Sequence, residues 1–220
     1  SFDQPREVYT YDVSANELTL LRPSRMDIDV SNLEVEHVWY ASADGTPVSM
    51  FLLHPEGSPR DGSVPYLLSG YGGFNISRTP AFSSAYALWA QCGGGVAVAN
   101  LRGGGEYGRA WHQAGMRQHK HHVFEDFIAA AEFLVAEGHS APERLAIAGG
   151  SNGGLLVSAV MAQRPDLFAT VLCAVPLTDM VRYPKFGIAS IWTEEYGNPD
   201  VEEDFNVLYD YSPYHNVRAG

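Results

Sequence analysis

Apolar residues in the middle of the chain form short runs bounded by glycines or polar residues. Four runs are apolar at nearly every position, at residues 64–70, 95–100, 144–149 and 170–175. Such runs are typical of strands buried on both faces of a sheet. Helical patterns alternate with them, over residues 83–91, 123–138 and 153–165. The alternation predicts an α/β fold, with a mainly parallel sheet and helices on both of its faces.

The first 34 residues follow a different pattern. Residues 6–13 and 17–22 alternate apolar and polar side chains around a turn-forming Ser-Ala-Asn, which predicts a β-hairpin. A single hairpin is too small to bury a core. From Leu33 the pattern of apolar and polar residues changes, and a second domain is predicted to begin there. We therefore expect residues 1–34 to be the tail of a separate β-domain and residues 35–220 to be the α/β domain.

The net charge of the chain limits its expected partners, and its cysteine content limits its expected disulfides. The chain has 14 Lys and Arg against 26 Asp and Glu, a net charge of −12. This charge repels phosphate backbones and anionic lipid, so neither nucleic acid nor a membrane is an expected partner. No apolar run approaches the roughly 18 to 20 residues that span a bilayer. Cys92 and Cys173 are too few for a disulfide framework, so we expect two buried, small apolar side chains.

Residues 149–153, Gly-Gly-Ser-Asn-Gly, fit the pattern G-x-S-x-G between a predicted strand and a predicted helix. That context is typical of a nucleophile elbow, because a serine in so tight a turn needs neighbours without Cβ atoms. Its hydroxyl stands beside a helix N-terminus, where N–H groups stabilise an oxyanion. A phosphate-binding loop would need a lysine after the glycines, which is absent. The motif predicts that Ser151 is a nucleophile.

The glycines of this stretch are each expected to serve close packing. Gly149 and Gly153 should make room for the bend, and Gly150 and Gly154 should let neighbouring backbone approach closely.

Three other segments have both a chemical and a structural interpretation. Residues 67–75 follow a strand, so Tyr71 either donates to an oxyanion or packs in a turn. The charged side chains of residues 100–112 are expected to form ion pairs that hold their loop: Arg102, Glu106 and Arg109. His119 and His122 have the i, i+3 spacing of metal ligands, but a polar loop leading into the helix is the favoured interpretation. We therefore expect no metal.

Six segments together carry a resemblance to a known family: YGGFN at 71–75, ANLRGGGEYG at 99–108, GGSNGGLL at 149–156, QRPDLF at 163–168, TEEYG at 193–197 and YSPYHNV at 211–217. The chain resembles prolyl oligopeptidases through nearly all of residues 35–220. The resemblance implies an α/β-hydrolase fold for that part. It also implies that residues 1–34 are the end of a β-propeller and the crossing into the hydrolase domain.

The resemblance also implies roles for individual residues. Ser151 would be the acylating nucleophile, and the Asn152 backbone N–H and the Tyr71 phenol would form the oxyanion hole. Trp192 would stack on the substrate proline ring, and three more side chains would complete the apolar pocket: Phe74, Leu177 and Tyr196. A flat indole suits proline, because the rigid ring offers a face and no donor to satisfy. No metal or cofactor is expected.

Serine hydrolysis also needs a histidine and a carboxylate. Asp179 and His215 follow Ser151 in the hydrolase order, but no core strand is predicted between them. By the resemblance, both catalytic groups lie beyond Gly220, and the chain, which starts without methionine, is a fragment. We expect these 220 residues alone to be inactive.

These inferences predict a serine endopeptidase that cleaves short peptides on the carboxyl side of proline. Open alternatives are a basic-residue oligopeptidase, a dipeptidyl-peptidase or an esterase of the same fold, and an inactive fragment or binding module. The resemblance further implies a monomer in the cytoplasm, with the periplasm as the alternative.

Overall fold

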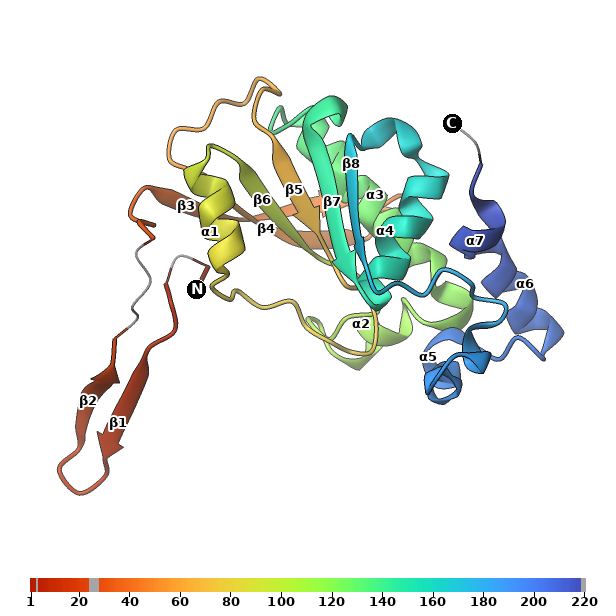
Figure 1. Ribbon diagram of the computed structural model, residues 1–220, viewed down its shortest axis with the longest axis horizontal. Coiled ribbons are helices and arrows are strands. Elements are labelled where there is room, and N and C mark those ends of the chain that lie inside the picture. The colour runs from red at the N-terminus through yellow and green to blue at the C-terminus, as the bar shows by residue number, and fades with distance from the viewer. Residues whose placement is uncertain (3, 24–27, 219–220) are drawn as a thin grey trace.

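The computed structural model describes residues 1–2, 4–23 and 28–218. The predicted domain of residues 1–34 includes residue 3 and residues 24–27, which lie outside the described part. The first hairpin is confirmed: β1 (Val8–Asp12) and β2 (Glu17–Arg22) pair as a two-stranded antiparallel sheet. All of their residues are exposed, and the hairpin extends away from the rest of the chain (Figure 1). Its assignment to a propeller stays a prediction.

A second sheet of six strands forms the body of the molecule. Its strands are β3 (Leu33–Ala41), β4 (Pro47–Pro55), β5 (Tyr66–Ser69), β6 (Gly95–Asn100), β7 (Leu145–Gly150) and β8 (Thr170–Ala174). The strand order is β3-β4-β6-β5-β7-β8. β6, β5, β7 and β8 run parallel, whereas β3 and β4 are antiparallel additions beside β6. The mainly parallel sheet is therefore confirmed.

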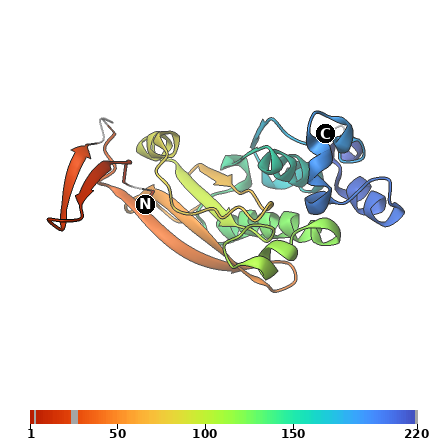
Figure 2. The ribbon, with the colours of Figure 1, turned by 90° about the horizontal axis from the view of Figure 1, so that it is seen from below.

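Within the described residues, seven α-helices connect or follow the strands: α1 (Ser84–Gln91), α2 (Arg109–Gln113), α3 (His121–Ala136), α4 (Asn152–Gln163), α5 (Thr193–Tyr196), α6 (Glu202–Tyr211) and α7 (Pro213–Asn216). The same part of the chain has five 3-10 turns: η1 (Arg117–His119), η2 (Pro142–Arg144), η3 (Pro165–Leu167), η4 (Tyr183–Lys185) and η5 (Ala189–Trp192). The C-terminal helices gather at the end of the molecule opposite the first hairpin (Figure 2). None of the described helices is long and apolar enough to cross a membrane.

The sheet has helices on both faces, as predicted. In β6, Ala97 and Ala99 belong to the large core that includes side chains of α3 and α4. Val96 and Val98 point the other way, into a smaller cluster with Tyr86 of α1. Figure 1 shows α1 in front of the sheet and α3 and α4 behind it. Burial on both faces explains why the central strands are apolar at every position.

Two expectations about burial are wrong. β8 was expected to be buried on both faces, but four of its five residues are exposed, including Leu172 at 54%. Among the described strands β8 pairs only with β7, so it forms an edge of the sheet. Both cysteines are exposed rather than buried. Cys173 lies on this edge strand, and Cys92 caps the C-terminus of α1 at the surface.

The segment before α3 also differs from its prediction. Residues 117–122 were expected to be a polar loop, but they form η1, the N-cap residue Lys120 and the first two positions of α3. The N–H of His119 donates to the carbonyl of Met116, and that of Lys120 to Arg117, so the chain turns helically before α3 begins.

Candidate active site

Ser151 occupies the sharp turn between β7 and α4. Its φ of 58° and ψ of −118° lie in a region that residues with a Cβ rarely adopt. The turn is fixed on both sides, because the Ser151 N–H donates to Ala174 O at 3.0 Å and the Ser151 carbonyl accepts from Leu155 N at 3.0 Å. A non-glycine residue with such φ costs about 1 to 3 kcal/mol, and the surroundings must hold it in place. The elbow therefore presents an exposed hydroxyl at the start of a helix.

The glycines around Ser151 differ in how much space they have. A Cβ on Gly149 would lie 2.0 Å from Gly153 O, so a side chain there is incompatible with the bend. A Cβ on Gly154 would lie 2.9 Å from Ala174 O, which confirms the predicted close approach of neighbouring backbone. The same expectation for Gly150 is wrong: its nearest neighbour would be 3.7 Å away, an ordinary contact.

Ser151 opens into a pocket of about 210 Å³. Six of the seven predicted site residues line it, together with Ile76: Tyr71, Phe74, Ser151, Leu177, Trp192 and Tyr196. Three aromatic rings meet edge to face there. The ring of Phe74 lies 6.2 Å from that of Trp192 and 5.5 Å from that of Tyr196. None of the lining residues carries a charge, so the pocket suits a flat, uncharged group.

Asn152, the seventh predicted residue, lies buried beside the pocket. It is the first residue of α4, so its backbone N–H has no acceptor within the helix and is available to an oxyanion next to Ser151. The side chain of Asn152 forms two hydrogen bonds of its own. Nδ2 donates to Tyr71 O at 2.5 Å, and the Tyr196 hydroxyl donates to Oδ1 at 2.8 Å. Asn152 thus links the loop that carries Tyr71 to the wall of the pocket.

Burial of Tyr196 raises the pKa of its phenol well above the usual value, so the group stays protonated and keeps donating. Sequence reasoning assigned Asn152 only its backbone N–H. The side-chain contacts were missed because their partners lie 81 and 44 positions away along the chain.

A buried ion pair also contacts the loop after β5, which carries Tyr71. Lys120 Nζ donates to Gly72 O at 2.9 Å and to Glu195 Oε1 at 3.3 Å. His112 Nε2 lies 2.8 Å from the other oxygen of Glu195. Burial lowers the pKa of Lys120, and the nearby carboxylate of Glu195 opposes that shift. This group joins the loop after β5 to the segment with Trp192 and Tyr196, and sequence reasoning did not find it.

The charged side chains after β6 only partly match the expectation of loop-holding ion pairs. Arg102 is buried and pairs with Asp126 and with Asp44, each at 2.6 Å. Glu106 instead accepts from the backbone N–H of Arg78 at 2.7 Å, and burial raises the pKa of its carboxyl. Arg109 is exposed and forms no ion pair with any described residue. The expectation is therefore confirmed for Arg102 and wrong for the other two, because the buried carboxyl of Glu106 meets a backbone N–H rather than a cation and Arg109 faces solvent.

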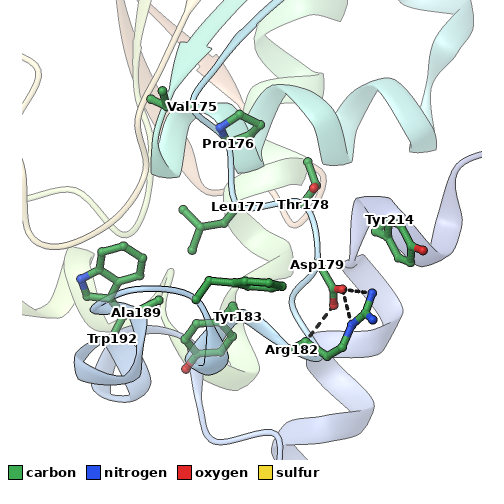
Figure 3. A pocket seen from close by; sticks show the side chains of 11 residues that line it. Val175, Pro176, Leu177, Thr178, Asp179, Arg182, Tyr183, Ala189, Trp192 and Tyr214 are labelled. Atoms are coloured by element: carbon green, nitrogen blue, oxygen red, sulfur yellow. Dashed lines mark hydrogen bonds and ion pairs between the residues drawn. The ribbon is translucent and has the colours of Figure 1, made fainter.

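Asp179 and His215 do not form a catalytic pair with Ser151. Asp179 accepts from Arg182 Nε at 2.6 Å, as Figure 3 shows. His215 Nδ1 lies 2.9 Å from Ser212 Oγ. No described side chain hydrogen-bonds to the hydroxyl of Ser151. Asp179 lines a second hollow of about 480 Å³, which adjoins the first through Leu177 and Trp192. Among the described residues, no histidine or carboxylate therefore contacts the hydroxyl of Ser151.

Comparison with known proteins relates the chain to one protein family. A family model described as the prolyl oligopeptidase family matches residues 80–220. A prolyl endopeptidase of Elizabethkingia meningoseptica is 44% identical over 98% of this chain and 31% of its own length. A prolyl endopeptidase of Dictyostelium discoideum is 42% identical over 97% of this chain and 29% of its own.

Solved structures agree with the sequence matches. One from a study of two prolyl endopeptidases superposes with a TM-score of 0.95 at 52% identity, covering 99% of this chain and 32% of that one. A post-proline cleaving enzyme from Rickettsia typhi gives a TM-score of 0.92 at 39% identity, over 96% and 31%. The chain spans about a third of the length of these relatives. By sequence and by fold, the chain belongs to the prolyl oligopeptidase family and contains the α/β-hydrolase architecture of its catalytic domain.

Proposed function

We propose that the intact protein is a serine peptidase that cleaves short peptides on the carboxyl side of proline. The observation that carries the proposal is the position of Ser151, which stands on a strained elbow and opens into an uncharged aromatic pocket. Relatives at 42% and 44% identity are named prolyl endopeptidases, which supports the same specificity.

The proposed mechanism is acyl transfer. Ser151 Oγ attacks the prolyl carbonyl carbon, its proton passes to a general base, and the carbonyl oxygen becomes an oxyanion that the Asn152 N–H and the Tyr71 phenol stabilise. The oxyanion then collapses, the C–N bond breaks, and the leaving amine takes the proton. Water hydrolyses the resulting ester of Ser151 by the same sequence of steps. No step requires a metal or a cofactor.

The specificity follows from the walls of the pocket. The indole of Trp192 offers a face for the proline ring, and Phe74, Leu177 and Tyr196 enclose it with apolar surface. An arginine or lysine side chain would lose its hydration there without gaining an ion pair, because no lining residue is acidic. The pocket therefore favours proline over the basic residues that the alternative oligopeptidase would require.

We further propose that the general base and its carboxylate lie outside these 220 residues. The support is that His215 and Asp179 are engaged with Ser212 and Arg182. The segment on its own is then expected to be inactive. A propeller domain that limits access to short peptides, a monomeric state and a cytoplasmic location are parts of the same proposal.

Two fluorogenic peptides that differ only in having proline or arginine before the scissile bond test the proposal, together with a simple ester. The intact protein should hydrolyse the proline peptide fastest, and Ser151→Ala should abolish turnover. Faster hydrolysis of the arginine peptide would contradict the specificity. Undiminished turnover by Ser151→Ala would contradict the mechanism, and absence of all turnover would favour a binding module.

A further inference from the structure

The first turn of α3 brings together two histidines and a glutamate away from the pocket. The ligand atoms of His121, His122 and Glu125 all lie within 4.8 Å of one another. In the described part of the chain, no other group of three or more His, Cys, Asp or Glu side chains meets this criterion. Helical geometry explains the cluster, because Glu125 lies one turn after both histidines on the same side of α3.

Backbone carbonyls hold both imidazole rings in the tautomer that leaves Nε2 available to a metal ion. His121 Nδ1 lies 3.1 Å from Gln118 O, and His122 Nδ1 lies 2.9 Å from Ala114 O. A carbonyl oxygen can only accept a hydrogen bond, so each Nδ1 carries the proton and each Nε2 has a free lone pair. Hydrogen bonds of this kind to backbone carbonyls orient the histidine ligands of metal sites.

The surroundings leave the cluster open to a cation. His121 is exposed, and His122 and Glu125 are half-buried, so an ion can enter and water can complete its coordination. The ring of His119 stacks on that of His122 at 5.7 Å and 5°, which further fixes the orientation of His122. The adjacent ammonium group of Lys120 points into the interior and pairs with Glu195, so it does not occupy the cluster.

We propose that His121, His122 and Glu125 bind a divalent transition metal ion, with Zn²⁺ as the fitting ion. Two imidazole nitrogens, one carboxylate oxygen and a water molecule are a common tetrahedral ligand set for Zn²⁺. Mg²⁺ and Ca²⁺ prefer all-oxygen ligands and should bind poorly. The net charge of −12 raises the local concentration of cations.

The site is independent of the proposed peptidase function. The sequence led us to expect no metal, because no acidic or thiol side chain directly accompanies His119 and His122 in their polar segment. The structure changes the interpretation: α3 begins at His121, which places Glu125 with His121 and His122.

Isothermal titration calorimetry of the tag-free intact protein with ZnCl₂, in a buffer without chelators, tests the proposal. One equivalent of Zn²⁺ should bind, and MgCl₂ at the same concentration should not compete. His122→Gln and Glu125→Gln should each weaken binding at least about tenfold, or about 1.4 kcal/mol. The control His37→Gln, an exposed histidine on β3, should bind as the wild type does.

Three results would overturn the proposal: no saturable Zn²⁺ binding, equal binding by Mg²⁺, or full-strength binding by the His122→Gln and Glu125→Gln variants. Circular dichroism checks that each variant is folded. Visible absorption of bound Co²⁺ gives a second readout, since an intense tetrahedral spectrum should appear with the wild type and the control and be lost with either variant.

Discussion

Substitution of Gly149 by alanine tests the steric basis of the nucleophile elbow. The added Cβ would lie 2.0 Å from Gly153 O and 2.5 Å from Gly153 C, both backbone atoms that cannot rotate away. Strand and helix must separate by more than an ångström to reach the 3.4 Å of an ordinary contact. Gly150→Ala is the matched control, because the same methyl group one residue later meets nothing closer than 3.7 Å.

The expected cost of Gly149→Ala is about 3 kcal/mol, at the upper end of overpacking in well-packed interiors. The cost of Gly150→Ala is expected to stay within about 0.5 kcal/mol. Urea unfolding of both variants measures these values. With a slope of about 2 kcal/mol/M, the midpoint should fall by about 1.5 M for Gly149→Ala and remain nearly unchanged for Gly150→Ala.

Activity should follow the same order, because a shift of about 1 Å in a catalytic group costs about a hundredfold in rate. Peptide hydrolysis by the intact Gly149→Ala protein should fall by at least that factor, whereas Gly150→Ala should retain most of its activity. Equal stability and activity in the two variants would refute the argument that contact between Gly149 and Gly153 shapes the elbow.

Three further predictions concern the pocket, the ion pair beside it and a buried histidine elsewhere in the core. Trp192→Ala should lower kcat/KM for proline peptides about tenfold or more by removing the indole face, mainly through KM; an unchanged KM in steady-state kinetics would contradict the stacking role. Lys120→Met removes the ammonium partner of the buried Glu195 carboxylate, so the free energy of unfolding should fall by about 3 to 5 kcal/mol. A loss under about 1 kcal/mol in urea titrations would contradict a stabilising role of the Lys120–Glu195 pair. Burial, followed by the charge of Arg60, lowers the pKa of His139 from 6.5 to about 4. The unfolded chain therefore binds the proton first as pH falls, and this contribution to stability, up to about 3 kcal/mol, should be lost between pH 6.5 and 4. Unfolding midpoints of the His139→Gln variant should show a shallower decline over that range, and an unchanged slope would refute this assignment.

The elbow could be predicted from the sequence because its causes are local. A strand, a serine flanked by glycines and a helix occupy one continuous stretch, and the steric demand acts between residues as close as Gly149 and Gly153. The same is true of the alternation of strands and helices, which predicted a mainly parallel sheet. The resemblance to a family added the pocket residues, which come from segments that no local pattern connects.

Contacts between distant segments could not be predicted. Lys120 and Glu195 are 75 positions apart, and nothing in their own segments indicates that they meet beneath the loop of Gly72. Burial of β8 was misjudged for a similar reason, since its apolar pattern does not reveal that it lies at the edge of the described sheet. The start of α3 was missed because histidine is a weak helix former, so His121 and His122 indicated a loop.

The central claim is that Ser151 is the nucleophile in a proline-binding site. Treatment of the intact protein with a serine-directed fluorophosphonate, followed by mass spectrometry of its peptides, tests this claim most directly. We predict that a single modification maps to Ser151, that a proline peptide slows it, and that a matched arginine peptide does not. Modification of a different residue, or protection by the arginine peptide instead, would contradict the account.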